Sequence, residues 1–372
     1  MKKILHINSY YQHSRFYKNL YDRQFQKAQN IAVYVPVSSN DNNSFDYGSY
    51  ALLDNCFNSY DRIFFHLKHG KIFSSIEKRY DWSNISLIHA HSLFSNGYIA
   101  YKLYKKYNIP YIVAVRNTDV NVFFKKMLHL RKMGVNILKN AKRIIFISQN
   151  YLELTRSKYI PKQFEKEFLE KSVVLPNGVD QYYIDHALKT PKIPHEDAID
   201  FLYVGEINQN KNVLFSAKCI DKLNHEGKCT FTMVGKITDK KIYQTVSAYD
   251  FVKHISPQKK ETLISYYRNA DIFIMPSITE TFGLVYVEAM TQGVPVIYTK
   301  GQGFDNQFPN GQVGYAVSSD SAEEVNEAVH SILDNYKELS NNCISLSKNL
   351  IGTSLRNNMM QFTICCLSKK GD

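Results

Sequence analysis

This sequence lacks the features that would mark a membrane-spanning or secreted protein. No window offers the ~18 or more uncharged apolar residues that a transmembrane helix needs. The first residues, MKKILHINSYYQHS, begin like a signal peptide, but the apolar part from Ile4 to Ile7 is too short and is interrupted by His6. We therefore interpret this segment as a first buried strand.

The cysteine and glycine patterns disfavour two further kinds of site. The six cysteines show no paired spacing of metal ligands, and the adjacent Cys365 and Cys366 suit neither a Cys-x-x-Cys site nor an easy disulfide. We interpret all six as reduced thiols of a cytosolic protein. No G-x-G-x-x-G follows the first expected strand in either half of the chain, which disfavours a dinucleotide-dependent oxidoreductase.

The net charge of +12 is unevenly spread. Residues 1–180 contain 27 Lys and Arg against 13 Asp and Glu, whereas residues 181–372 contain 19 against 21. All of the excess positive charge therefore lies in the first half. Such an asymmetry indicates an anionic partner for that half: a membrane surface, a nucleic acid or a phosphorylated acceptor.

The pattern of apolar runs predicts an α/β protein with two domains. A length of 372 residues and a hydrophobic content of 44% are enough for two sizeable cores. In the first half we expect strands at KKILHIN, DRIFFHL, SLIHAH, YIVAV, RIIFIS and SVVLP. Helical patterns lie between some of them, which favours parallel sheets with helical crossovers.

A second series of strands begins at DFLYVG and continues through TFTMVG, FVKHI, ADIFIMP, VPVIYT and GYAVS. Two such series predict two Rossmann-like domains, which we place at residues 1–185 and 186–350. The linker is expected between Asn177 and Asp200, where two prolines interrupt the chain and the apolar residues have neither helical nor strand spacing. Residues 351–372 form a C-terminal segment that could return to the N-terminal domain.

The most informative stretch is PSITETFGLVYVEAMTQGVPVI, from Pro276 to Ile297. The apolar run before it predicts a buried strand from Ala270 to Ser277, and FGLVYVEAMTQG has helical spacing up to Gly293. Glu280 is therefore expected in the loop at a strand's carboxyl end, and Glu288 near the start of the next helix.

The start of this helix suits an anionic ligand. Its first backbone N–H groups are unpaired and the helix dipole favours negative charge there. These groups belong to three residues: Phe282, Gly283 and Leu284. Ligands of open α/β sheets bind at this edge. Two carboxylates can accept hydrogen bonds from hydroxyl groups, and a ligand with both phosphates and hydroxyls is a nucleotide sugar, which the pattern therefore predicts. The alternative is that both glutamates are solvated surface residues.

The motif PS-x-x-E-x-FGL-x-x-x-EAM-x-x-G-x-PVI resembles the donor-site signature of family 4 retaining glycosyltransferases. That family has the GT-B fold, in which two Rossmann-like domains face each other across a cleft. The resemblance implies that Glu280 is catalytic and holds the donor sugar together with the amides of Phe282 to Leu284. It also implies that Glu288 hydrogen-bonds the ribose hydroxyls of the donor.

Two other segments resemble the same family. VVLPNGVD, from Val173 to Asp180, resembles its linker motif, and FLYVGEINQNKN resembles the strand-loop-helix that opens its C-terminal domain. The second match implies that Lys211 is a catalytic group that pairs with the donor diphosphate, with Gly205 and Glu206 beside the donor. Glu206 stands where the family usually has Arg, so either it points away from the diphosphate or another cation substitutes.

The N-terminal half departs further from the family. No glycine occurs in NSYYQHSRFYKNL after the first strand, and Arg116 in VRNTD stands in place of a family histidine. Arg116 stays protonated and cannot act as a base, but it could hold a phosphate or an acceptor hydroxyl as a catalytic group. The alternative is an ion pair with Asp119. His89 and His91 share one face at a strand end and are further candidates, with core packing of at least one as the alternative.

The segment from Asn121 to Arg143 mixes Phe123, Phe124 and other apolar residues with Lys and Arg. A basic amphipathic segment of this kind binds anionic bilayers, and we expect peripheral membrane contact here. The alternative is a helix with an apolar core face and a solvated basic face.

We therefore expect a retaining glycosyltransferase that moves a hexose-type sugar from a nucleotide donor, a UDP-sugar, to a glycan or lipid-linked acceptor in cell-surface polysaccharide biosynthesis. No cofactor, metal or nucleic-acid partner is expected, because no Asp-x-Asp motif stands out and the family needs no metal. The expected location is cytoplasmic, at the inner face of the plasma membrane. The alternative is a basic membrane- or nucleic-acid-binding protein with a vestigial sugar-nucleotide site.

Overall fold

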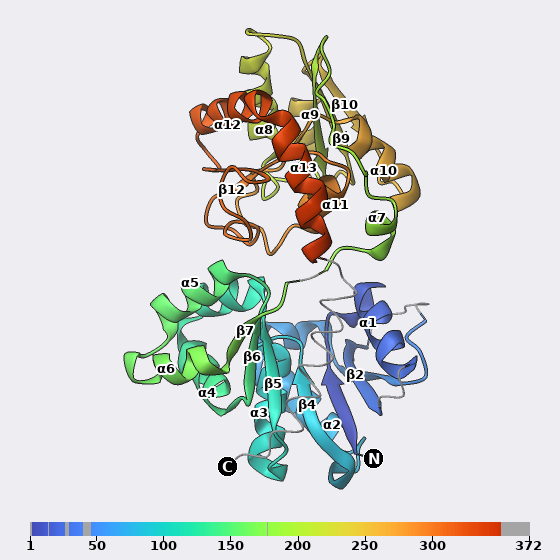
Figure 1. Cartoon of the computed structure of the whole chain (residues 1–372). Coiled ribbons are helices and arrows are strands. Elements are labelled where there is room, and N and C mark those ends of the chain that lie inside the picture. Colours follow the sequence, from blue (N-terminus) through green and yellow to red (C-terminus); the bar gives the residue numbers. More distant parts are fainter. Residues whose placement is uncertain (1, 14, 27–29, 40–45, 177, 351–372) are drawn as a thin grey trace. The chain divides into compact units, whose positions relative to one another are not determined.

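The computed structural model describes residues 2–13, 15–26, 30–39, 46–176 and 178–350 (Figure 1). The chain forms two compact units. Among the described residues, the N-terminal unit comprises those up to Ile147 and Tyr151–Leu175, and the C-terminal unit comprises Ser148–Asn150 and Pro176–Leu350. The division at Leu175 falls before the predicted boundary at residue 185. The predicted segment 351–372 lies outside the described residues.

The N-terminal unit contains a seven-stranded parallel sheet with the strand order β3-β2-β1-β4-β5-β6-β7 (Figure 1). The strands are β1 Lys3–Ile7, β2 Ile31–Ser38, β3 Ala51–Phe57, β4 Ile85–Ala90, β5 Tyr111–Val115, β6 Arg143–Phe146 and β7 Ser172–Val174. The described helices are α1 Arg15–Gln26, α2 Phe65–Glu77, α3 Ser95–Tyr107, α4 Arg131–Asn140, α5 Gln149–Tyr159 and α6 Lys162–Lys171. Strands β2 and β5 are buried along their whole length, as expected where helices cover both faces of a parallel sheet.

The C-terminal unit contains a six-stranded parallel sheet with the order β10-β9-β8-β11-β12-β13. The strands are β8 Ile199–Val204, β9 Cys229–Val234, β10 Val252–Ile255, β11 Ile272–Ile274, β12 Val296–Thr299 and β13 Gly314–Val317. The helices are α7 Gln181–Asp185, α8 Val213–Leu223, α9 Lys240–Val246, α10 Lys260–Asn269, α11 Leu284–Thr291, α12 Ala322–Asp334 and α13 Tyr336–Ser347. Two parallel α/β sheets are what the sequence predicts.

The predicted strand at DRIFFHL is wrong. Its residues form the end of a short 3-10 helix, η2 Ser59–Ile63, and the first turn of α2. The Asp61 carboxylate accepts a hydrogen bond from the Asn58 N–H at 2.8 Å, which stabilises a helical turn at this point. Ile63 and Phe64 are 76% and 64% exposed, so this apolar run belongs to the surface and not to the sheet.

Candidate functional site

The candidate site of the C-terminal unit lies where its strand order reverses. The chain passes outward from β8 to β9 and β10, then returns to β11 on the other side of β8. Phe201 of β8 pairs directly with Ile272 of β11, so the loops that follow these two parallel strands leave the sheet at the same edge. This reversal is the point at which open α/β sheets bind ligands.

Lys211 and Glu280 come from these two loops and form an ion pair. The Lys211 Nζ lies 2.6 Å from Glu280 Oε2, and the two side chains are 24% and 10% exposed. The other Glu280 oxygen, Oε1, accepts the Thr281 N–H at 2.8 Å. Two residues that the sequence predicts as catalytic, 69 positions apart, are therefore in direct contact.

Asn208 and Asn212 hold the loop that presents Lys211. The Asn208 side-chain oxygen accepts the Lys211 N–H at 3.0 Å. The Asn212 amide donates to the Pro276 carbonyl at 3.0 Å and to the Ser319 carbonyl at 2.7 Å. The loops after β8 and β11 are thus fixed to each other, which positions the ammonium against the carboxylate.

The predicted anion-binding turn is the start of α11. Gly283 is the N-cap with φ of 74°, and Leu284 is the first helical residue. A Cβ on Gly283 would lie 2.2 Å from the Tyr286 ring, so glycine is required at this position for its conformation and for space. Phe282 is buried. The first N–H groups of α11 have no partner within the helix, and they lie directly after Glu280 in the chain.

Glu288 lies in the middle of α11 and is partly buried. Its Oε2 accepts the Tyr267 hydroxyl at 2.8 Å. Burial raises the pKa of Glu288 to about 7, and hydrogen bonds from Tyr267 and Tyr183 limit the rise. The carboxyl is therefore poised between its charged and neutral forms near neutral pH, a property of groups in functional sites.

Gly205 and Glu206 follow β8 directly. The Glu206 side chain is exposed, and its Oε2 accepts a hydrogen bond from the Asn208 amide at 3.2 Å. The Glu206 carbonyl accepts the Tyr203 hydroxyl at 2.6 Å. The carboxylate therefore bonds within its own loop, whereas the Lys211 ammonium bonds across to Glu280.

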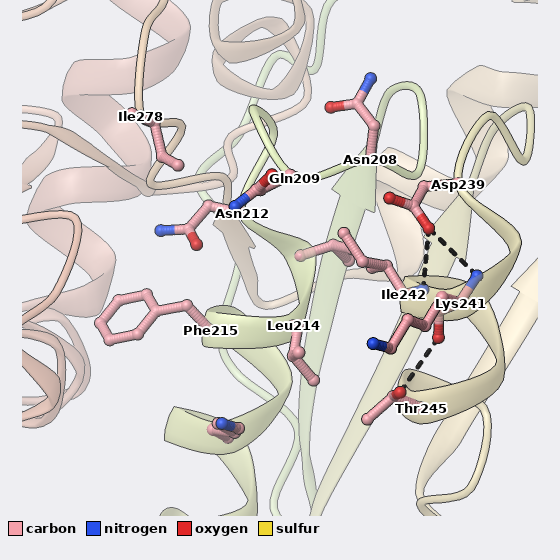
Figure 2. Close-up of a pocket in the computed structure, with 12 residues that line it drawn as sticks. Asn208, Gln209, Asn212, Leu214, Phe215, Asp239, Lys241, Ile242, Thr245 and Ile278 are labelled. Carbon is pink, nitrogen blue, oxygen red and sulfur yellow. Dashed lines mark hydrogen bonds between the residues drawn. The ribbon is translucent and has the colours of Figure 1, made fainter.

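A cavity of about 510 Å³ opens beside this loop, between α8 and α9 (Figure 2). Its wall includes Asn208, Gln209 and Asn212 from the loop and Ile278 from the loop after β11. Lys211 and Glu280 are not among the residues that line it. The cavity therefore flanks the loop, and the ion pair is a separate feature.

Arg116, at the carboxyl end of β5, does not use its guanidinium to bond Asp119. The Arg116 Nε donates to the His91 carbonyl at 3.0 Å, and the Arg116 backbone N–H donates to Asp119 Oδ2 at 2.8 Å. Asp119 is buried and also accepts the N–H groups of Leu93 and Phe94. Burial raises the pKa of Asp119 to about 6. Asp119 thus connects the loops after β4 and β5.

His89 and His91 are both core residues and join His6 in a buried cluster. The His6 Nδ1 lies 3.1 Å from His91 Nε2, which also lies 3.0 Å from the Tyr21 hydroxyl. One ring nitrogen from each histidine lies within 4.8 Å of the others. Such a group could hold a metal ion, as could His195, Asp200 and Asp271. The absence of a metal requirement stays a prediction from the sequence.

The sequence analysis did not single out His6 for the site. Its only signal was polarity within the apolar first strand. The contact with His91 requires the parallel pairing of β1 with β4, which places His6 opposite His89. The cluster lies where the order of the N-terminal sheet reverses, between β1 and β4.

The predicted membrane-binding segment 121–143 is not one amphipathic helix. It comprises part of a π-helical turn, η4 Asp119–Phe124, a 3-10 turn, η5 Leu128–Leu130, and α4. Phe124 is fully buried and stacks on Tyr159 at 4.7 Å between ring centroids, and Phe123 stacks on Phe94 at 4.7 Å. Phe124 is therefore not available to a bilayer, whereas Phe123 is only partly buried, and membrane contact by this segment stays a prediction.

Comparisons with known proteins agree with this architecture. The family model "Glycosyltransferase Family 4" matches residues 27–181, and the model "Glycosyl transferases group 1" matches residues 185–349. An uncharacterized glycosyltransferase of Methanocaldococcus jannaschii, MJ1178, is 23% identical over 68% of this chain and 66% of its own length. TuaC of Bacillus subtilis, a putative teichuronic acid biosynthesis glycosyltransferase, is 24% identical over 70% of this chain and 65% of its own length. The chain thus matches about two thirds of each of these relatives.

Two solved structures show the same fold. Sucrose-phosphate synthase from Thermosynechococcus elongatus has a TM-score of 0.77 at 16% identity and covers 98% of both chains. The Anabaena protein Alr3699/HepE in complex with UDP-glucose has a TM-score of 0.67 at 15% identity and covers 98% of this chain and 100% of its own.

The two parallel sheets and the two family models define a glycosyltransferase with the GT-B fold. Within that class, the chain belongs to glycosyltransferase family 4. In the part of the chain that the structure describes, no helix has the length and hydrophobicity to span a bilayer.

Proposed function

We propose that this enzyme transfers a hexose from a UDP-sugar to a glycan or lipid-linked acceptor, with retention of the anomeric configuration, in the synthesis of a cell-surface polysaccharide. The observation that carries the proposal is the Lys211–Glu280 ion pair next to the start of α11. It combines a cation, a carboxylate and helix N–H groups at the sheet edge where α/β proteins bind nucleotides. The complex of HepE with UDP-glucose and the relationship to TuaC support the choice of donor and pathway.

Lys211 is the group that would meet the diphosphate. Its ammonium is partly exposed, so a phosphate oxygen can approach it while Glu280 remains close. The N–H groups of Phe282, Gly283 and Leu284 add positive potential at the same place. Lys211 and these amides would stabilise the charge that develops on the departing UDP. Gly205 and Glu206 would border the donor at the end of β8.

Glu280 would accept hydrogen bonds from the transferred sugar, and Glu288 from the ribose hydroxyls. In the reaction, the bond from the anomeric carbon to the phosphate oxygen breaks, and a bond to the acceptor oxygen forms on the same face of the sugar. The acceptor proton passes to the leaving phosphate oxygen. No side chain is needed as a nucleophile in this scheme, and Arg116, which cannot be a base, would hold a phosphate or an acceptor hydroxyl.

In this proposal residues 186–350 bind the donor and residues 1–185 bind the acceptor. The positive charge of the first half suits an acceptor at the inner face of the plasma membrane. The expected location is therefore the cytoplasm, with peripheral association to that membrane.

Release of nucleotide from a panel of nucleotide sugars tests the proposal. The purified protein should release UDP from a UDP-hexose, and Glu280→Gln should abolish this while the exposed control Glu327→Gln leaves it unchanged. Proton NMR of the first-formed glycoside should show the anomeric configuration of the donor. An inverted product would refute retention. Absence of turnover with every donor would instead favour a vestigial site in a basic binding protein.

A further inference from the structure

An apolar ridge protrudes from the N-terminal unit along η2 and the first turn of α2. Four large side chains are exposed there: Tyr60 at 82%, Ile63 at 76%, Phe64 at 64% and Leu67 at 52%. We call these four residues the η2–α2 ridge. Single exposed apolar residues are common on protein surfaces, but several adjacent ones form a patch that typically marks an interaction site.

Beyond the ridge, the exposed face of α2 carries basic side chains. Leu67, Lys71, Ser74 and Lys78 have the spacing of one helix face, and all four are exposed. Residues 59–79 contain five Lys and Arg but only two acidic residues, Asp61 and Glu77. The η2–α2 ridge is therefore apolar, and the exposed face of α2 that continues from it is basic.

A hollow of about 520 Å³ lies among these cations. It is lined by Cys56, Lys71, Ser74, Ser75, Lys78 and Arg79. Lys71 bonds to Asp61 at 2.8 Å, and Arg79 bonds to Asp54 at 2.9 Å. These contacts fix Lys71 and Arg79, and the Ser75 hydroxyl donates to Asp54 Oδ2 at 2.5 Å. Lys78 and the Ser74 hydroxyl complete the polar lining. A site with this lining suits a phosphate group.

A second basic stretch adjoins the ridge. Phe65, in the first turn of α2, packs edge-on against Phe123 with 5.9 Å between the ring centroids. The chain continues from Phe123 to Lys125, Lys126 and Leu128, which are exposed. The basic segment 121–143 thus supplies charge beside the ridge, although Phe124 is buried and Phe123 is partly buried.

We propose that the η2–α2 ridge inserts into the interface of an anionic phospholipid bilayer, with lipid phosphates held by the cations of α2. Charge complementarity supports this occupant, because a neutral apolar partner would not need the cations that continue from the ridge along α2. Apolar side chains on a basic helix face are the pattern of interfacial membrane binding. This inference deepens the proposed function, on which it rests, by naming the surface that meets the membrane of a lipid-linked acceptor.

Sedimentation with vesicles of phosphatidylglycerol and phosphatidylcholine tests the ridge. The full chain should bind such vesicles at low salt, and binding should weaken at least tenfold in pure phosphatidylcholine. Ile63→Ser/Phe64→Ser/Leu67→Ser should weaken binding at least tenfold without a change in thermal unfolding, because all three side chains are exposed. The matched control Ile193→Ser, 77% exposed in the C-terminal unit, should bind like the wild type. Equal binding by the triple variant and the wild type would overturn the proposal.

Insertion can be located directly, because Trp82 is the only tryptophan of the chain. In a Trp82→Phe background, Ile63→Trp should show blue-shifted fluorescence and quenching by lipids with brominated acyl chains. Ile193→Trp in the same background should show neither. Bound vesicles without a shift at position 63 would overturn insertion of the ridge.

The outcomes separate this inference from the proposed function. UDP release in the absence of lipid should be the same in the triple variant and the wild type, because the ridge belongs to the N-terminal unit, whereas Lys211 and Glu280 belong to the C-terminal unit. A chain that binds vesicles through the ridge but releases no nucleotide would refute the enzyme proposal and leave the ridge assigned. A chain that turns over a donor but ignores anionic vesicles would overturn the ridge assignment and indicate a protein partner for this surface.

Discussion

Lys211 and Glu280 lie 2.6 Å apart at the edge where β8 and β11 end, with Glu280 almost fully enclosed. In the proposed donor site, this pair would have two roles that oppose each other. Glu280 needs a cation because a buried carboxylate without a partner is costly, whereas a diphosphate needs the same cation. In the donor complex the Lys211 ammonium would interact with both the Glu280 carboxylate and a phosphate. The energetic contributions of Lys211 and Glu280 should therefore depend on each other.

The stability of the free enzyme should reveal this dependence. Lys211→Met leaves Glu280 without its cation and should lower the free energy of unfolding by about 1–3 kcal/mol, less than for a fully buried pair because Lys211 is partly exposed. Lys211→Met/Glu280→Gln should recover much of this loss. Urea unfolding of the two single variants and the double variant gives the coupling energy. Additive effects would mean that the two side chains do not depend on each other in solution.

Lys211→Ala should weaken UDP binding more than uridine binding, because its proposed partner is the phosphate charge. A charge-assisted hydrogen bond is worth about 1.5–3 kcal/mol, so the affinity for UDP should fall about ten- to a hundredfold while the affinity for uridine changes little. Isothermal titration calorimetry with the two ligands measures this. Glu206→Arg is a companion variant: tighter UDP binding would place position 206 beside the diphosphate, and unchanged binding would place it away. Equal losses for UDP and uridine in Lys211→Ala would remove Lys211 from the phosphate site.

Glu288→Ala should weaken binding of the donor nucleotide about ten- to a hundredfold, because a hydrogen bond to a charged group is worth about 1.5–3 kcal/mol. The matched variant Glu288→Gln keeps the shape and one acceptor oxygen, so it should lose less. Calorimetric titration with UDP compares them. Unchanged affinity in Glu288→Ala would rule out the ribose assignment.

The raised pKa of Glu288 also predicts how stability depends on pH. Its pKa is about 7 in the folded chain against an ordinary value of 4.5 for a glutamate, so the folded state binds the proton more tightly than the unfolded state. The carboxyl therefore lowers stability above pH 7, and this cost disappears as the pH falls toward 4.5. Glu288→Gln should be more stable than the wild type at pH 8, by up to about 3 kcal/mol, and close to it at pH 4.5. Thermal unfolding at both pH values checks this, and a constant difference between the two proteins would contradict it.

The sequence placed Lys211 and Glu280 at one edge of the sheet, because each residue follows a recognisable strand and parallel strands present their carboxyl ends at one edge. It predicted partners in the donor for both residues, and the ion pair between them was not anticipated. The two parallel sheets followed from the alternation of apolar runs in the same way. What failed was the assignment of DRIFFHL to a strand. A short apolar run without a period does not distinguish a buried strand from an exposed helix start, and the Asp61 turn decided between them.

The packing of Phe123 and Phe124 could not be read from the sequence for a different reason. Their basic neighbours suggested a surface segment, but the rings are held by Phe94 and Tyr159, which lie far away in the chain. Likewise, the histidine cluster depends on the register between β1 and β4, which fixes His6 opposite His89. Contacts of this kind require the tertiary arrangement and leave only a weak local pattern.

The histidine cluster of the N-terminal unit should make the protein sensitive to mild acid. Burial lowers the pKa of His6 to about 3 and lowers the pKa values of His89 and His91 well below 6.5. Below about pH 6.5 the three histidines bind protons in the unfolded chain but stay neutral in the folded chain. The stability that the neutral histidines allow is therefore complete above pH 6.5 and is lost as the pH falls. Each histidine then costs up to about 1.4 kcal/mol per pH unit. The raised pKa values of Asp119 and Glu288 oppose this loss, but they are two groups against three.

His89→Leu tests this sensitivity, because both ring nitrogens of His89 are buried without a partner in the structure. Both proteins should lose unfolding free energy when the pH falls from 7 to 5.5, but the variant should lose about 1 kcal/mol less than the wild type. The reason is that only two histidines, instead of three, then bind protons in the unfolded chain and not in the folded chain. The exposed control His129→Asn should follow the wild type at both pH values. Urea unfolding of chelator-treated protein measures the three free energies. If His89→Leu and the wild type lose the same stability between pH 7 and pH 5.5, the cluster is hydrated or already protonated in solution, and the acid sensitivity must come from other groups.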